Sequence, residues 1–194
     1  MKTKKSLVIA ITGASGSIYA STLISDLLLL RDYIDPERLS LVVSDNGDQV
    51  FEHEMGYRAS AISGIKHYSN TDFYAPFASG SGNYDGMVIV PCSMGTLGKI
   101  AHGISDNLIT RTADVMLKER NKLILVTRET PISLIHIKNM ELITLAGGIV
   151  CPANPSFYSK PLQVHDLVKT VTNRIISLLG IECNSFQWPG TFTP

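Results

Sequence analysis

Short apolar runs alternate along the chain with longer segments whose apolar residues recur at helical spacing. The first run covers residues 6–12 and ends at Gly13, and residues 18–30 follow with apolar side chains three and four positions apart. A run without polar alternation is typical of a strand buried on both faces of a parallel sheet, whereas a period near 3.6 predicts a helix. The chain therefore begins as strand, glycine turn and helix.

The same order recurs as far as the last helical segment. Further strands are expected at residues 39–43, 87–90, 123–126 and 148–150. Further helices are expected around residues 50–54 and at 95–102, 108–120, 133–146 and 162–179. Residues 60–86 are expected to form a loop, because Gly, Ser and Asn gather at 79–83. This order predicts an α/β fold with a doubly wound, mostly parallel sheet, Rossmann-like or flavodoxin-like, and helices on both faces.

Length and composition narrow the class of protein. A chain of 194 residues fits one domain, which we place at residues 1–180, followed by a C-terminal arm at 181–194. Hydrophobic residues make up 44% and the formal net charge is zero, which favours a packed core and gives no attraction to nucleic acid or membrane. The 3 cysteines form no CxxC pair. We therefore expect a cytoplasmic protein without a disulfide framework or a metal site.

Two turns at the expected carboxyl ends of strands are rich in small residues. Residues 13–16 read Gly-Ala-Ser-Gly, and residues 91–96 read Pro-Cys-Ser-Met-Gly-Thr. Glycine lets the backbone approach a ligand, and the following helix offers unpaired N–H groups, so each turn can hold a phosphate or a flavin edge. Tight turns with serine N-caps are the alternative. Neither segment matches a Walker A motif or a full GxGxxG.

Several charged residues are candidates for anion binding or proton transfer. Arg111 and Lys118 are seven residues apart on one expected helix and share a face, and Arg174 lies on the last helix. A solvated surface is the alternative for each of them. Arg128 differs because it ends an expected strand, and Glu129 beside it can act as a general acid or base if it is partly buried.

The sequence resembles the UbiX-type flavin prenyltransferases over essentially its whole length. The matching segments are TGASG at 12–16, VPCS at 90–93, TL at 96–97, DNLITRTADV at 106–115, LKER at 117–120, RETP at 128–131, PA at 152–153 and FY at 157–158. The resemblance implies that reduced FMN receives a dimethylallyl group at N5 and C6 from dimethylallyl phosphate. It also implies a homo-oligomer, a dodecamer, with active sites at subunit contacts. The prenylated FMN would pass to a partner decarboxylase, with ubiquinone biosynthesis as the expected pathway.

The resemblance also assigns residues to roles. The flavin would be held by Gly13, Ala14, Ser15, Ser44, Ser93, Met94, Gly95, Thr96 and Arg128. The prenyl phosphate would be held by Lys118, Tyr158 and Arg174, with Arg111 and Ser15 nearby. Glu129 and Glu54 would carry protons, and Ser15 would join them in catalysis. Phe73 stands where some relatives place a tryptophan over the prenyl group, and its ring still offers a π face.

Two other functions are compatible with this fold. A flavin-dependent cysteine decarboxylase would carry a Pro-x-Met-Asn segment, but residues 152–155 here read Pro-Ala-Asn-Pro, and Tyr158 follows. A non-catalytic flavin carrier would not need the additional phosphate-type ligands. Both alternatives are therefore less favoured than the prenyltransferase.

Overall fold

The computed structural model describes residues 4–183 and Phe186, and its centre is a six-stranded sheet in the order β3-β2-β1-β4-β5-β6. The strands are β1 Lys5–Ile11, β2 Ile34–Val43, β3 Lys66–Tyr68, β4 Gly86–Cys92, β5 Lys122–Thr127 and β6 Ile149–Val150. Every neighbouring pair is parallel. Without the short β3, the order is that of a flavodoxin-like sheet, and with β3 it is that of a Rossmann sheet. The predicted fold class is confirmed.

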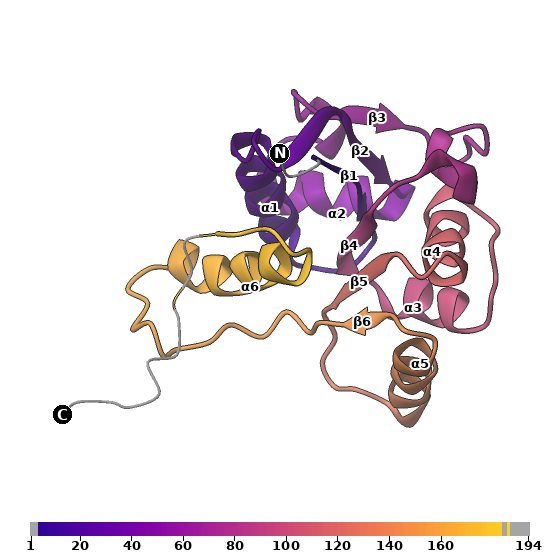
Figure 1. Cartoon of the computed structure of the whole chain (residues 1–194). Helices are drawn as coiled ribbons and strands as arrows, with labels where there is room; N and C mark the ends of the chain where they lie inside the picture. The colour runs from indigo at the N-terminus through magenta and orange to yellow at the C-terminus, as the bar shows by residue number, and fades with distance from the viewer. Residues whose placement is uncertain (1–3, 184–185, 187–194) are drawn as a thin grey trace.

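Helices cover both faces of the sheet (Figure 1). They are α1 Ser17–Leu29, α2 Asp45–Met55, α3 Met94–Ala101, α4 Leu108–Lys118, α5 Leu134–Leu145 and α6 Val164–Leu178. Helices α1 and α6 pack together and share one core with Phe51 of α2. Helices α3, α4 and α5 bury their apolar residues in a second core. The two faces therefore carry different helices, and each helix is confined to one of them.

The strand side chains divide between these two cores by simple alternation. In β1, Leu7, Ile9 and Ile11 belong to the α1/α6 core, whereas Val8 and Ala10 belong to the α3/α4/α5 core. All five are at most 1% exposed. Because both faces are apolar, the strand shows the continuous hydrophobic run that the sequence displays.

The expectation of an unbroken loop at residues 60–86 is wrong in part. Lys66–Tyr68 forms β3, which pairs with residues 40–42 of β2 at the edge of the sheet. One-turn 3₁₀ helices occupy Ala59–Ala61, Pro76–Ala78 and Gly80–Gly82. In this three-residue strand only Tyr68 is partly buried, against Phe77 of the α3/α4/α5 core, so the strand leaves no hydrophobic period in the sequence.

Most of the expected C-terminal arm, including Trp188, lies outside the described residues. Within the described part, Ile181 is 3% exposed and packs in the α1/α6 core. Among the described residues, no helix combines the length and the apolar composition that crossing a bilayer requires.

Candidate functional site

The loops that follow β1, β2 and β4 meet at the carboxyl edge of the sheet, where the strand order reverses. The Ser44 N–H donates to the Ile11 carbonyl at 3.0 Å, and the Ser93 N–H donates to Thr12 Oγ1 at 2.8 Å. A Cβ on Gly13 would lie 2.8 Å from the Cβ of Asn46, so this close approach requires glycine. The structure thus brings together the predicted flavin residues Gly13, Ala14, Ser15, Ser44, Ser93, Met94, Gly95 and Thr96.

Ser44 and Ser93 are N-caps, of α2 and α3 respectively. Ser44 Oγ accepts an N–H of its helix at 3.1 Å, and Ser93 Oγ accepts the Thr96 N–H at 3.3 Å. Capping does not exclude ligand binding, because a hydroxyl that accepts one hydrogen bond can still donate its proton. Gly95 is exposed, with no atom within 4 Å of the position that a Cβ would take, so a ligand can reach its backbone. Met94 is 8% exposed and offers a ligand its main chain rather than its side chain.

Glu54, in the last turn of α2, directs its carboxylate at the start of α1. The N–H groups of Gly16 and Ser17 donate to it over 2.7 to 3.2 Å, and the Ser15 hydroxyl is a further partner. Burial opposes ionisation of Glu54, but these hydrogen bonds outweigh it and hold its pKa below the ordinary value. The carboxylate also faces the positive end of the helix dipole. Within one chain, Glu54 is therefore an anchored anion in contact with Ser15, another of the three predicted catalytic residues.

Arg128 and Glu129 follow β5, and both are exposed. Arg128 extends toward the first turn of α1, since its Cδ lies 3.8 Å from the position of a Cβ on Gly16. Glu129 Oε1 accepts the Thr130 N–H at 3.0 Å. Arg128 therefore lies beside the loop that follows β1, at the carboxyl edge of the sheet. One chain does not supply the partial burial on which the acid–base interpretation of Glu129 depends.

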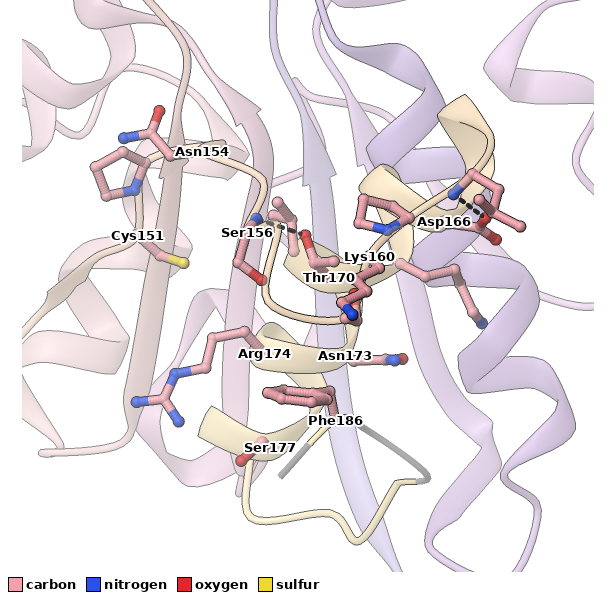
Figure 2. A pocket seen from close by; sticks show the side chains of 16 residues that line it. Cys151, Asn154, Ser156, Lys160, Asp166, Thr170, Asn173, Arg174, Ser177 and Phe186 are labelled. Atoms are coloured by element: carbon pink, nitrogen blue, oxygen red, sulfur yellow. Dashed lines mark hydrogen bonds between the residues drawn. The ribbon is translucent and has the colours of Figure 1, made fainter. Parts of the chain in front are cut away.

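A groove of about 700 Å³ lies between α6 and the segment that joins β6 to α6. Arg174 extends from α6 into this groove, on the same side as Cys151 (Figure 2). Lys169 also lines it, but its Nζ is held by Asp26 of α1 at 2.6 Å. No hydrogen bond or salt bridge to another described residue holds the Arg174 guanidinium. Lys160 also lines the groove, and no salt bridge to another described residue holds its ammonium, so Arg174 and Lys160 are both available to an anionic ligand.

Two further residues of this region bear on the chemistry of the groove. Tyr158 is 60% exposed and lies between Ser156 and Ser159, which both line the groove. Burial raises the pKa of the Cys151 thiol, and the positive charge of Arg174 acts in the opposite direction. At neutral pH the thiol is protonated, so the positive charge in this part of the groove is not neutralised by a thiolate.

Arg111 and Lys118 lie on α4, over the opposite face of the sheet from α6 (Figure 1). Arg111 donates to the Ala78 carbonyl and to Asp114, each at 3.0 Å, and Lys118 pairs with Glu119. Phe73, which is 46% exposed, belongs to the segment that contacts the start of α4 through Asn70. Within one chain the structure therefore does not bring Lys118 together with Arg174.

Comparison with known proteins gives one consistent result. The family model described as Flavoprotein matches residues 1–176. The flavin prenyltransferase UbiX of Methanocaldococcus jannaschii is 41% identical over 187 residues, covering 95% of this chain and 98% of the relative. The solved AnUbiX (PadA1), in complex with FMN and dimethylallyl pyrophosphate, superposes with a TM-score of 0.86 at 36% identity, covering 95% and 100% of the two chains. A dodecameric FMN-dependent UbiX-like decarboxylase from Escherichia coli O157:H7 superposes with a TM-score of 0.88 at 35% identity, covering 94% of this chain and 98% of that one.

The chain belongs to the Flavoprotein family, among its UbiX-type flavin prenyltransferases. The resemblance seen in the sequence is thereby confirmed. The FMN-dependent cysteine decarboxylase TvaF is only 17% identical, with a TM-score of 0.57, which is a likeness of fold alone.

Sequence reasoning gave no role to Thr12, which is the first residue of the matching segment at 12–16. Thr12 is 2% exposed, and its hydroxyl links the loop after β1 to the loop after β4. In the sequence it is only the last residue before a glycine turn. Its partners are about 80 positions away, at separations of 79 and 81 residues, and no local pattern indicates them.

Replacing Glu54→Gln should destabilise this UbiX-type protein by about 1 kcal/mol near neutral pH, because an amide caps α1 less well than a carboxylate. The pKa of Glu54 is lowered in the folded state, so its contribution is complete above the unfolded value, near 4.5, and is lost as the pH falls through the folded value. Urea unfolding of parent and variant at several pH values measures this. The free energies of unfolding of the parent and the variant should become equal at acidic pH.

Glu52→Gln is the matched control on the same helix, because Glu52 makes an exposed ion pair with Arg58. Such pairs contribute little, so this variant should stay within about 0.5 kcal/mol of the parent. Equal stability of parent and Glu54→Gln near neutral pH would contradict the capping role, as would a difference that persists in acid.

Proposed function

We propose that this protein is a flavin prenyltransferase that transfers a dimethylallyl group from dimethylallyl phosphate to N5 and C6 of reduced FMN. The proposal rests on the position of two turns, taken together with the family to which the chain belongs. Two small-residue turns, 13–16 and 93–96, lie side by side where the strand order reverses, and the chain is a UbiX-type family member. Open space over Gly95 and the close packing at Gly13 fit a flat ring or a phosphate held by backbone and hydroxyl groups.

The residues of the chain divide the chemistry among them. FMN, when bound, supplies the nucleophilic atoms N5 and C6. Cleavage of the allylic C–O bond leaves a phosphate dianion, and Arg174 with Tyr158 would hold it through charge-assisted and hydroxyl hydrogen bonds. The π face of Phe73 would stabilise the cationic carbon fragment. The carboxylate of Glu129 would accept the proton that leaves the flavin ring, while Glu54 fixes Ser15 beside the flavin.

A second copy of the chain is needed to complete this site. Lys118 and Arg174 lie over opposite faces of one sheet, so they can hold one phosphate only if they come from different copies. Helix α5 and the residues before it also expose apolar side chains that nothing in the described chain covers: Ile132, Leu134, Ile135, Ile137, Leu142 and Leu145. We infer a closed homo-oligomer, a dodecamer like that of the E. coli relative.

The same proposal includes the enzyme that would use the product and the compartment in which the reaction would occur. The product would be consumed by a decarboxylase that depends on prenylated FMN, in the cytoplasm, with ubiquinone biosynthesis as one destination. A neutral net charge and a reduced, unpaired set of cysteines support that setting.

The proposal is tested by the reaction itself. Purified protein, loaded anaerobically with reduced FMN and given dimethylallyl phosphate, should release phosphate and yield a flavin heavier by one isoprene unit in mass spectrometry. The flavin released from the protein should be FMN and not the dinucleotide. Unchanged flavin together with oxidative decarboxylation of a cysteinyl peptide would support the cysteine decarboxylase instead.

The substitution Arg174→Ala should weaken the binding of dimethylallyl phosphate by about one to two decades in Kd, because one charge-assisted hydrogen bond to phosphate is lost. FMN affinity should hold, since the small-residue turns lie elsewhere. Lys169→Ala is the control: it lines the same groove, but its Nζ is already paired with Asp26. The measurement is the substrate concentration dependence of single-turnover yield. Weaker FMN binding in Arg174→Ala, with an unchanged dependence on the dimethylallyl phosphate concentration at saturating FMN, would refute this division of the site.

Replacing Ile135→Lys should break the oligomer, because Ile135 is 71% exposed on α5 and a charge cannot be buried there without a partner. Leu29→Lys, at the end of α1 and 81% exposed, is the control and should assemble normally. Light scattering coupled to size exclusion measures both. A parent protein that is monomeric at micromolar concentration would exclude the assembly. An unchanged mass for Ile135→Lys would exclude α5 as its contact.

A further inference from the structure

The carboxyl edge of the sheet contains a buried hydroxyl, that of Thr12, to which no role is assigned. Thr12 follows β1 directly and is 2% exposed, so its side chain is hidden from any ligand. Its Oγ1 donates to the Pro91 carbonyl at 2.8 Å and accepts the Ser93 N–H at 2.8 Å. A single hydroxyl thus uses both its donor and its acceptor capacity on the loop after β4.

The hydrogen bonds of Thr12 lie just beyond the last paired residues of β1 and β4. The parallel pairing of β1 with β4 runs from Leu7 opposite Gly86 to Ala10 opposite Ile89. Beyond it, Pro91 has no N–H to donate, so the ladder cannot continue through that residue. The main-chain N–H of Thr12 donates to the Pro91 carbonyl at 3.2 Å, and the hydroxyl adds the second and third contacts.

The two loops joined in this way are the ones that carry the small-residue turns. The turn at 13–16 begins at the residue after Thr12, and the turn at 93–96 begins at Ser93, the residue bonded to it. The hydroxyl therefore fixes the spacing between the two turns, and it satisfies an N–H at the start of α3 that would otherwise be left without a partner.

We propose that Thr12 is a positioning residue for flavin, which sets the distance between the two turns without touching the ligand. This inference rests on the proposed function, because it concerns the turns that would hold FMN. Thr12→Val keeps the shape of the side chain and removes the hydroxyl. FMN affinity should then fall roughly tenfold or more, while Thr12→Ser should stay within about threefold of the parent.

Thr172→Val is the matched control. Thr172 lies in α6, is 0% exposed, and its Oγ1 has no partner among the described residues. The same chemical change at a buried threonine whose hydroxyl bonds to neither turn should leave FMN affinity unchanged. The measurement is fluorescence titration of FMN into flavin-free protein, well below the unfolding temperature, with circular dichroism to confirm folding.

Each result decides. Weaker FMN binding in Thr12→Val, with binding retained in Thr12→Ser and Thr172→Val, supports the inference. Parent-like FMN affinity in Thr12→Val overturns it, even if the variant is less stable, and so does equal loss in Thr12→Ser. If Thr12→Val gives no folded protein, Thr12→Ala is read by the same criterion. A parent that does not bind FMN would refute the proposed function instead.

Discussion

Parallel strands send all their carboxyl ends to one edge of the sheet, and the chain must return over one face or the other before it can add the next strand. In this protein the return from β1 crosses one face through α1, and the return from β4 crosses the other through α3 and α4. The loops after β1 and β4 therefore diverge from neighbouring strands and leave a crevice between them. The small-residue turns, the N-capped helices and the anchored Glu54 all lie at this edge.

The same constraint separates the cationic residues. A helix packed on one face of a sheet cannot place its side chains on the other, because the sheet and its two cores lie between them. Arg174 is available within one chain, whereas Arg111 and Lys118 are already engaged by neighbours on α4. A site that needs both groups is a property of an assembly, and the exposed apolar residues of α5 are consistent with one.

Much of this architecture could be predicted from the sequence, for a physical reason. Strands β1, β4 and β5 are buried on both faces, and burial leaves continuous apolar runs. Strand β3 could not be predicted, because an edge strand of three residues in which only Tyr68 is partly buried leaves no apolar run in the sequence. The roles of Glu54 and Thr12 depend on partners tens of residues away, so they follow from the packing of loops and not from any local pattern. Sequence spacing placed Arg111 and Lys118 on one helix, but it could not say which face of the sheet that helix would cover.

The two outermost strands have a consequence for how copies of this chain can meet. β3 has three residues and β6 has two, so each outermost strand offers a neighbour very little unpaired backbone. Continuous sheets across subunits, and the runaway edge-to-edge stacking that leads to fibrils, both need longer borders. The proposed assembly would therefore join its copies through the side chains of helices and loops, and a set of such contacts that closes on itself gives a finite particle.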